Sequence, residues 1–206
     1  MKIVHYSDGL SLVEYLTKEQ ELVGTVQEPT LFTWVVAPTV IYGRHQSAEV
    51  EVNKQYCRQK GITIVQRKSG GGCVYADEGN LMISLVSPSA HNEDVFAQFL
   101  NMISGALNEA GLPAVTTEHN DILIDGKKVS GCACYTTSTG TIVHGTLLFD
   151  VDLEALEQAI TPTNAKLAKH GVASVRQRVT NIKTKTDKFA DIQALRLFIE
   201  QYAERY

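Results

Sequence analysis

The spacing of apolar residues along the chain switches repeatedly between the helical and the strand period. Leucine and valine recur at helical spacing over residues 10–23, a longer apolar stripe runs over 93–110, and an amphipathic segment covers 190–204. Each pattern predicts a helix with one buried face. Asn53 and Gly61 stand where an N-cap and a helix-ending glycine would, which predicts a short helix between them. The apolar positions of the first helix are Leu12, Val13, Leu16 and Leu22.

The segment 93–110 carries the clearest helix signals in the chain. Asn92 is the expected N-cap, acidic residues suited to the helix dipole follow it, and Gly111 is expected to close the helix. The residues expected to face the core are Val95, Phe99, Met102, Ile103, Ala106 and Leu107.

Short apolar runs between turn residues predict strands in the rest of the chain. They cover residues 31–43 with a break at Pro38, Thr63–Gln66, the alternating Leu81, Ile83 and Leu85, Asp121–Ile124, and Thr141–Val151. An Asp-Gly pair, here Asp125-Gly126, between apolar runs is the strongest short hairpin signal. Strands joined by a hairpin and interrupted by helices predict an α/β (α+β) fold, in which helices pack against a mixed sheet.

Length and composition fit one globular domain. The 206 residues can bury a single sizeable core, so residues 1–206 are expected to form one domain without an accessory domain after it. A net charge of −4 disfavours nucleic-acid binding, which needs a basic surface. No apolar run reaches the length of a membrane span, no signal peptide begins the chain, and the four cysteines lack a disulfide or zinc spacing. We therefore expect a cytoplasmic protein that binds neither nucleic acid nor membrane.

The most informative stretch surrounds three consecutive glycines, Gly70–Gly72, between two predicted strands. Each costs about 0.5–1 kcal/mol relative to alanine, so a chain keeps them where something must approach the main chain closely. Their N–H groups can form a nest for an anion, and Arg67 adds a positive charge beside them. A flexible surface turn is the alternative, which Arg67 and the turn at 77–80 disfavour. The spacing matches neither a Walker loop nor a Rossmann fingerprint.

Two further polar residues interrupt apolar strands. Lys128 follows the predicted hairpin turn, and strand alternation would place Ser130 and Cys132 on its face. A lysine beside a hairpin turn is usually solvated, and a histidine within an apolar strand, such as His144, is usually a packed residue. Neither residue identifies an activity by itself.

Several segments together resemble the lipoate–protein ligase family. The run RKSGGGCVYADEGNL resembles the family's glycine-rich signature, and NDILIDGKKVSG resembles its hairpin with the adenylate lysine. Three further segments resemble family blocks: VIYGRHQSAEVEVN, HGTLLFDVDLEAL and SVRQRVTN. The resemblance extends from about residue 30 to 185, with the blocks in the family's order.

The resemblance implies both a fold and an activity. The fold would be the catalytic domain shared with biotin–protein ligases, a mixed and largely antiparallel central β-sheet flanked by helices. The enzyme would activate lipoate or octanoate with ATP and Mg²⁺ to an acyl-AMP, and would transfer the acyl group to a lysine of a lipoyl carrier domain. The implied carriers are the E2 subunits of 2-oxoacid dehydrogenases and the H protein of glycine cleavage.

The same resemblance implies roles for individual residues. Lys128 would be the catalytic residue, between the acyl carbonyl and the α-phosphate, and Asp121 would also bind Mg²⁺. The residues implied in binding ATP or the adenylate are Arg67, Gly70, Gly71, Gly72, Cys73, Val74, Tyr75, Asn120, Asp121 and Lys128. Those implied in binding lipoate are Trp34, Arg67, Gly72, Lys128 and His144.

The sequence departs from the family pattern at three points. Gln66 replaces the first of two arginines, and Ala76 replaces a histidine expected to contact the ligand. The chain also ends at Tyr206, where many ligases continue into a small accessory domain. A truncated chain and a ligase half that needs a separate accessory subunit are both compatible with this end point.

Two other activities are compatible with the same residues. An ATP-independent lipoyl or octanoyl transferase would need a cysteine nucleophile. Residues 116–119, where related transferases carry it, contain none, which leaves Cys73, Cys132 and Cys134 as candidates. A non-catalytic lipoate or nucleotide sensor on the same fold is the remaining alternative. Exchange of pyrophosphate into ATP that depends on lipoate would identify a ligase.

Overall fold

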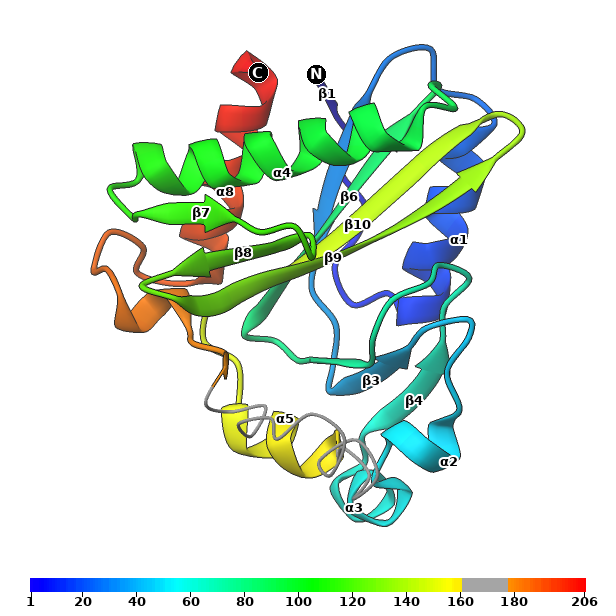
Figure 1. The fold of residues 1–206 in the computed structure, drawn as a ribbon, viewed down its shortest axis with the longest axis vertical. Coiled ribbons are helices and arrows are strands. Elements are labelled where there is room, and N and C mark those ends of the chain that lie inside the picture. Colours follow the sequence, from blue (N-terminus) through cyan, green and yellow to red (C-terminus); the bar gives the residue numbers. More distant parts are fainter. Residues whose placement is uncertain (161–177) are drawn as a thin grey trace.

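The computed structural model describes residues 1–160 and 178–206, and its centre is a seven-stranded sheet (Figure 1). The strands lie in the order β1-β2-β6-β10-β9-β8-β7, and among them only the short pair β1 and β2 is parallel. Their bounds are β1 Lys2–Ile3, β2 Thr30–Trp34, β6 Asn80–Ser87, β7 Ala114–Thr116, β8 Asp121–Ile124, β9 Lys127–Thr137 and β10 Gly140–Leu148. The expected mixed, largely antiparallel sheet is confirmed.

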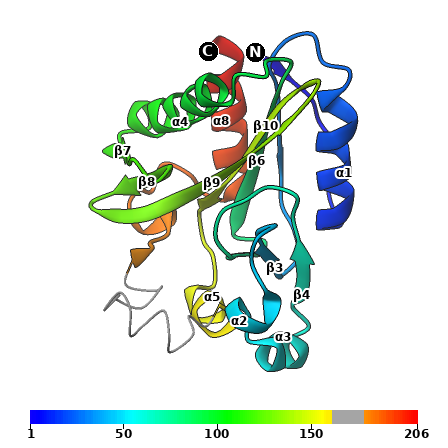
Figure 2. The same ribbon diagram turned by 45° about the vertical axis from the view of Figure 1, so that its right-hand side comes forward.

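Helices cover both faces of this sheet, as Figure 2 shows from a second direction. α4 (Asn92–Glu109) and α8 (Ile192–Arg205) lie on one face, and α1 (Leu12–Val23) lies on the other. Because successive strand residues point to opposite faces, β6 serves both layers. The odd-numbered Leu81, Ile83 and Leu85 pack with α4 and α8, whereas the even-numbered Met82 and Val86 pack with α1. A central strand buried on both faces explains its continuous apolar run.

A smaller three-stranded sheet, in the order β4-β3-β5, lies below the large one in Figure 1. β3 pairs parallel with β4 and antiparallel with β5. The bounds are β3 Thr39–Tyr42, β4 Thr63–Gln66 and β5 Val74–Ala76, with the helices α2 Ala48–Glu51, α3 Lys54–Lys60 and α5 Leu153–Ala159 and the 3₁₀ helix η1 Ile182–Thr184. Side chains of β3, β5, α2, α3 and α5 share one apolar cluster. The loop between β4 and β5 is the glycine-rich run.

The helices agree with the sequence patterns apart from details at their ends. Asn53 caps α3 through its side chain, and Gly61 ends it in the left-handed conformation, as expected. The N-cap of α4 is His91, which makes no side-chain cap, so the prediction of Asn92 was wrong by one residue. The expected core residues of α4 are all buried. In α1, Val13 is exposed, and the buried stripe consists of Leu12, Tyr15, Glu19 and Val23.

Strand ends depart more from expectation than strand positions do. The segment 31–43 splits into β2 and β3 around Pro38, as predicted. The predicted strand Thr141–Val151 ends earlier, at Leu148, because Asp152 then caps α5 with its carboxylate. The sequence pattern did not predict α5, which has too few residues for a periodic signal.

The hairpin at Asp125-Gly126 is present, but its register contains a bulge. Both turn residues have positive φ, 50° and 72°, as a tight two-residue turn requires. Ile122 pairs with Ser130, and the next residue pairs with Lys128, so Val129 is an extra residue in β9. The simple alternation that placed Lys128 on the face of Ser130 and Cys132 was therefore wrong.

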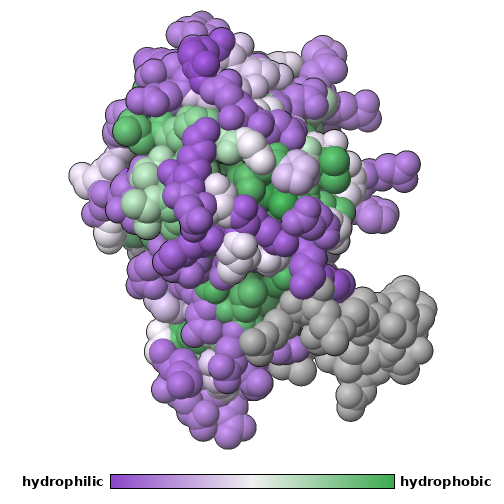
Figure 3. Space-filling model, turned by 90° about the vertical axis from the view of Figure 1, so that its left-hand side faces the viewer, coloured by the Kyte–Doolittle hydropathy of each residue, from purple (hydrophilic) through white to green (hydrophobic). Residues whose placement is uncertain are grey.

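The surface is mixed in polarity. On the side where α4 and β7 lie, apolar patches are interrupted by polar side chains (Figure 3). No helix within the described parts of the chain is long and apolar enough to cross a membrane.

Candidate active site

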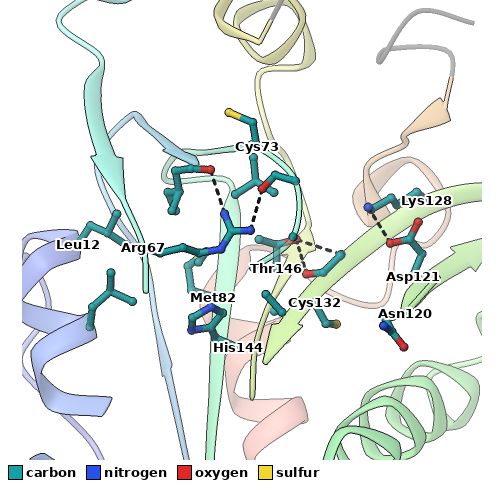
Figure 4. A pocket seen from close by; sticks show the side chains of 18 of the residues that line it. Leu12, Arg67, Cys73, Met82, Asn120, Asp121, Lys128, Cys132, His144 and Thr146 are labelled. Atoms are coloured by element: carbon teal, nitrogen blue, oxygen red, sulfur yellow. Dashed lines mark hydrogen bonds and ion pairs between the residues drawn. The ribbon is translucent and has the colours of Figure 1, made fainter. Parts of the chain in front are cut away.

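A cavity of about 360 Å³ lies between the two sheets and α1. One part of its wall is apolar and is formed by Leu12, Leu16, Trp34, Ile41, Val74 and Met82. The other part is polar and is formed by Arg67, Gly71, Gly72, Cys73, His119, Asn120, Asp121, Lys128 and Thr146. In Figure 4, Arg67 and Cys73 come from the glycine loop, Thr146 from β10, and Asn120, Asp121 and Lys128 from the hairpin and the turn before it. A ligand with one apolar and one charged end fits such a wall.

Arg67 organises the glycine loop from within. It is 6% exposed, and its guanidinium donates to the Ser69 hydroxyl at 2.9 Å and to the carbonyl of Ile41 at 3.1 Å. It also donates to the carbonyls of Gly70 and Gly72, at 2.6 and 2.7 Å. A rigid fork with several donors can hold a loop in this way, whereas a lysine could not. These four hydrogen bonds hold the loop in one conformation.

The orientation of these carbonyls determines where the loop N–H groups point. In a trans peptide the C=O and the next N–H lie on opposite sides. Because the carbonyls of Gly70 and Gly72 face Arg67, the N–H groups of Gly71 and Cys73 face away from it. Gly71 has φ of +88°, which a residue with a side chain rarely adopts. This geometry accounts for the glycines and resembles an anion-binding nest.

A second segment approaches the loop so closely that it too requires glycine. A Cβ on Gly43 would lie 2.3 Å from the carbonyl oxygen of Gly71, which no packing adjustment of a side chain could relieve. The neighbouring Arg44 N–H donates to the carbonyl of Ser69 at 3.0 Å. The segment VIYGRHQ, which resembles a block of the family, therefore supports the glycine loop from outside.

Lys128 and Asp121 form an ion pair at the other end of the polar wall. The Lys128 Nζ lies 2.7 Å from Asp121 Oδ1, and both side chains are partly exposed to the cavity. Asn120 precedes Asp121 with φ of 62°, a left-handed conformation that asparagine tolerates better than most residues. The turn before β8 thus presents its polar side chains to the cavity.

His144 belongs to a chain of buried polar groups along the inner wall. Its Nε2 is 2.7 Å from the Ser69 hydroxyl, and its Nδ1 is 3.1 Å from each oxygen of Glu19. Ser84 donates to Glu19 at 2.6 Å and accepts from the indole of Trp34 at 2.9 Å. The network therefore runs from the apolar wall through β6, α1 and β10 to the glycine loop.

Sequence reasoning missed Glu19, although a signal was present. Glu19 lies on the buried stripe of α1 and is 2% exposed. A charged residue on the apolar stripe of a helix is rarely buried without a partner. The partner, His144, is far away in the sequence, so only the tertiary structure identifies it.

Two of the three candidate cysteine thiols, Cys132 and Cys134, differ from reactive nucleophiles. Cys132 lines the cavity, and burial raises its pKa to about 12, although Ser130 and Lys128 oppose the shift. Burial also raises the pKa of Cys134. A catalytic cysteine needs a lowered pKa, since the thiolate is the nucleophile. Neither thiol has that environment.

The structure brings together most residues that the sequence singled out. Arg67, Gly71, Gly72, Cys73, Val74, Asn120, Asp121, Lys128, Trp34 and His144 all line the cavity. Gly70 and Tyr75 do not: Gly70 contributes its carbonyl to Arg67, and Tyr75 is buried in the cluster around α3 and α5. The part of the SVRQRVTN segment before Arg178 lies outside the described residues.

The departures from the family pattern lie outside this cavity. Ala76 is fully buried in the core beneath α1 and does not line the cavity. Gln66 donates to the carbonyl of Arg44 and lines a neighbouring cavity of about 290 Å³ that shares Leu16 and His144 with the first. The turn that follows at Asp77 is structural, because its carboxylate accepts from the N–H groups of Gly79 and Asp152.

The described wall of the cavity offers one carboxylate to a magnesium ion. Asp121 is the only acidic residue among those that line the cavity, and the described residues contain no cluster of three metal-ligating side chains. Mg²⁺ commonly binds through one or two carboxylates together with substrate phosphates. The site therefore fits a magnesium ion that is held mainly by a bound nucleotide.

Comparison with known proteins identifies close sequence relatives. The lipoate-protein ligase LplJ of Bacillus subtilis is 35% identical over 178 residues, which cover 84% of this chain and 52% of the relative. Lipoate–protein ligase 1 of Staphylococcus aureus is 33% identical over 208 residues, 96% of this chain and 61% of the relative. The chain thus spans about half the length of the curated relatives it matches.

Solved structures agree with the sequence comparison. A lipoate-protein ligase A bound with ATP has a TM-score of 0.84 at 25% identity, covering 98% of this chain and 83% of that one. A bi-partite lipoate protein ligase from Thermoplasma acidophilum has a TM-score of 0.81 at 27% identity, covering 98% and 81%. A biotin protein ligase from Aquifex aeolicus shares the fold, with a TM-score of 0.54 at 17% identity over 98% and 69%.

The family assignment rests on nearly the whole chain. Residues 5–203 match the family described as the lipoyl protein ligase A/B catalytic domain. The match includes both the glycine loop and the hairpin, so it covers the elements that form the cavity. The chain therefore belongs to the lipoyl protein ligase A/B catalytic domain family.

Proposed function

We propose that this chain binds a lipoyl-adenylate and transfers its acyl group to a lysine of a lipoyl carrier domain. The observation that carries the proposal is the two-part cavity wall. The apolar part around Trp34 and Met82 suits a short acyl chain, and the polar part suits the adenylate phosphate. The acyl–phosphate bond would then lie near Lys128.

The chemistry has two steps with clear requirements. In the first, a carboxylate oxygen of lipoate attacks the α-phosphorus of ATP, and pyrophosphate leaves with its bonding electrons. In the second, the neutral amine of a carrier lysine attacks the acyl carbon, the acyl–phosphate bond breaks, and AMP and one proton leave as the amide forms. Both steps gather negative charge, which fixed donors stabilise. Lys128 would serve the acyl and phosphate oxygens, and the Gly71 N–H would face the phosphate region.

Magnesium would act with the nucleotide. When bound, it would neutralise phosphate charge during adenylation. The phosphate oxygens of the nucleotide would supply most of its ligands, since Asp121 is the only acidic side chain among the described residues that line the cavity. The second step needs no metal, since AMP is already a good leaving group once its phosphate is held.

Relatives support the substrate and the partners. Curated relatives are named lipoate-protein ligases, and a structure at 25% identity is described as bound with ATP. The Thermoplasma acidophilum system is described as a bi-partite ligase and its E2 lipoyl domain. We extend this to lipoyl carrier domains in general, with E2 subunits and the glycine cleavage H protein as the candidates. A separate accessory domain is part of the proposal, because the chain spans about half of its curated relatives.

An ATP-independent transferase is less well supported. Its intermediate would be a thioester on a cysteine thiolate. The thiol of Cys132, which lines the cavity, has a pKa raised to about 12, and Lys128 is paired with a carboxylate instead of a thiol. A ligase mechanism uses the lysine, and no cysteine.

Two assays test the proposal together. Intact mass of a lipoyl domain after incubation with the chain, lipoate, ATP and Mg²⁺ should show one added lipoyl group. Replacing lipoate and ATP with synthetic lipoyl-AMP should give the same product faster. A carrier that stays unmodified under both conditions would exclude the proposed function. Modification from a lipoyl thioester or lipoyl-carrier donor without ATP would favour the transferase.

A further inference from the structure

The bulge in β9 determines which way the catalytic lysine points. Val129 is the extra residue, so Lys128 and Gly131 lie on the same side of the strand in spite of their spacing. The backbone of Lys128 is fixed from outside the hairpin, because its carbonyl accepts from the Thr180 N–H at 3.0 Å. Without the bulge, alternation would send the lysine and the glycine to opposite faces.

Gly131 leaves the space that the lysine side chain occupies. A Cβ on Gly131 would lie 2.8 Å from Lys128 Nζ and 2.9 Å from Cε. The glycine cannot move aside easily, because its N–H donates to the Thr146 hydroxyl at 3.3 Å and its strand pairs with β8 and β10. Any side chain at position 131 must therefore displace the ammonium group.

Asp121 stands directly across the hairpin from Gly131 and holds the ammonium in that space. A lysine ammonium has three N–H donors. The 2.7 Å contact with Asp121 Oδ1 uses one, which leaves two for other acceptors. An acyl carbonyl oxygen and a phosphate oxygen would each accept one of these two remaining N–H donors. Figure 4 shows Lys128 and Asp121 pointing toward one another at the edge of the cavity.

We propose that Asp121 and Gly131 are positioning residues for Lys128, and that Asp121 acts through the ammonium group and not as a magnesium ligand. This inference rests on the proposed function and adds a division of roles within the hairpin. By accepting one N–H of the Lys128 ammonium, Asp121 sets the direction of the other two. By having no side chain, Gly131 lets the end of the Lys128 side chain lie against the strand at this depth in the cavity.

The test uses binding of a stable adenylate analogue, so it does not depend on turnover. The probe is 5′-O-(N-lipoylsulfamoyl)adenosine, measured by calorimetry with the full chain. Asp121→Asn and Gly131→Ala should each weaken binding by about tenfold, because a misplaced ammonium loses its charge-assisted hydrogen bonds. In a Lys128→Ala background, the same two changes should have almost no further effect.

Matched controls separate positioning from folding. Asp125→Asn removes a carboxylate from the same hairpin, where Asp125 pairs with Lys185 at 2.9 Å, away from the cavity. Gly24→Ala adds a methyl group at a glycine with open space around it. Both should bind the analogue like the parent chain. If Gly131→Ala fails to fold by circular dichroism, Asp121→Asn alone decides.

The outcomes distinguish the inference from the proposed function. Equal losses in the parent chain and in the Lys128→Ala background would overturn the inference, since they would mean direct contact with the ligand. A shift of the Mg²⁺ half-saturation of adenylation by more than about threefold in Asp121→Asn would overturn it as well. Failure of the parent chain to bind the analogue at all would overturn the proposed function, and the inference with it.

Discussion

The two cationic side chains among the described residues of the cavity are held in different ways, which suits the different roles that we propose for them. Arg67 is buried and donates to one hydroxyl and three carbonyls, so its geometry is fixed. Lys128 pairs with Asp121 through a partly exposed side chain. A fixed guanidinium suits the maintenance of a loop, whereas a compact ammonium with spare donors suits oxygens whose charge changes during reaction.

Lys128→Ala should reduce transfer from lipoyl-AMP by about 10²–10³-fold, because it removes a donor aimed at the developing charge. Lys127→Ala should be nearly silent, since Lys127 is exposed on the other side of the hairpin and does not line the cavity. Single-turnover transfer to a lipoyl domain, with thermal unfolding as a folding control, measures both. Equal losses in the two variants would mean that the cavity does not contain the reacting bond.

The cysteines provide a prediction about pH. The Cys132 thiol has a pKa raised to about 12 by burial, so at pH 8 only about one molecule in 10⁴ carries the thiolate. Below pH 12 that small fraction rises about tenfold for each pH unit, so transfer through this thiolate would rise steeply between pH 7 and 9. A mechanism that uses Lys128 and no thiolate should show no such cysteine-dependent rise. A chain with Cys73, Cys132 and Cys134 changed to Ala should keep its transfer activity. A trapped acyl-thioester, seen by mass in the parent chain and lost in this variant, would contradict the prediction.

At the level of elements, close backbone contacts hold the site in place. Gly79 lies in the turn between β5 and β6, and a Cβ there would be 2.0 Å from the carbonyl oxygen of Asp150. The N–H groups of Phe149 and Asp150 both donate to the Gly79 carbonyl. The turn therefore joins the small sheet to the end of β10, and with it one side of the cavity to the other.

Gly79→Ala should destabilise the fold by about 1–3 kcal/mol, since a backbone atom must move to admit the methyl group. For a chain of this size, the unfolding temperature should fall by roughly 2–4 °C for each kcal/mol. Gly24→Ala, which meets nothing within 4 Å, is the control and should unfold near the temperature of the parent chain. Calorimetry measures both. An unchanged melting temperature for Gly79→Ala would mean that this contact is not maintained in solution.

Elements with local signals could be predicted from the sequence. The hairpin at Asp125-Gly126 requires two positive φ angles, and the residues that permit them are adjacent. The bulge at Val129 has no such signal, because it depends on pairing with β8 and on Thr180. The pairing of Glu19 with His144 has none either, since its members lie on different elements. Site residues within one motif were therefore predictable, and contacts between motifs were not.

For the whole molecule, the charge of the described cavity wall suits the proposed adenylate better than ATP. The adenylate has one phosphate group, and ATP has three. Among the described residues that line the cavity, the only lysine and arginine are Lys128 and Arg67. The first is paired with Asp121, and the second donates to the glycine loop. The described residues of the cavity therefore leave little positive charge for the two outer phosphates, which would need Mg²⁺ and cations from outside this set.

The isolated chain should therefore transfer from synthetic lipoyl-AMP but form the adenylate slowly unless an accessory domain is supplied. Adding such a domain should raise adenylation at least about tenfold and leave transfer almost unchanged, because transfer uses contacts that the cavity already provides. Gln66→Arg should increase adenylation more than transfer, since it places a further cation next to the glycine loop. Ala76→His is a poor choice for the same purpose, because position 76 is fully buried in the core. Stopped-flow measurement of each half-reaction decides the matter. Rapid adenylation by the chain alone would show that the cavity and Mg²⁺ suffice for all three phosphates.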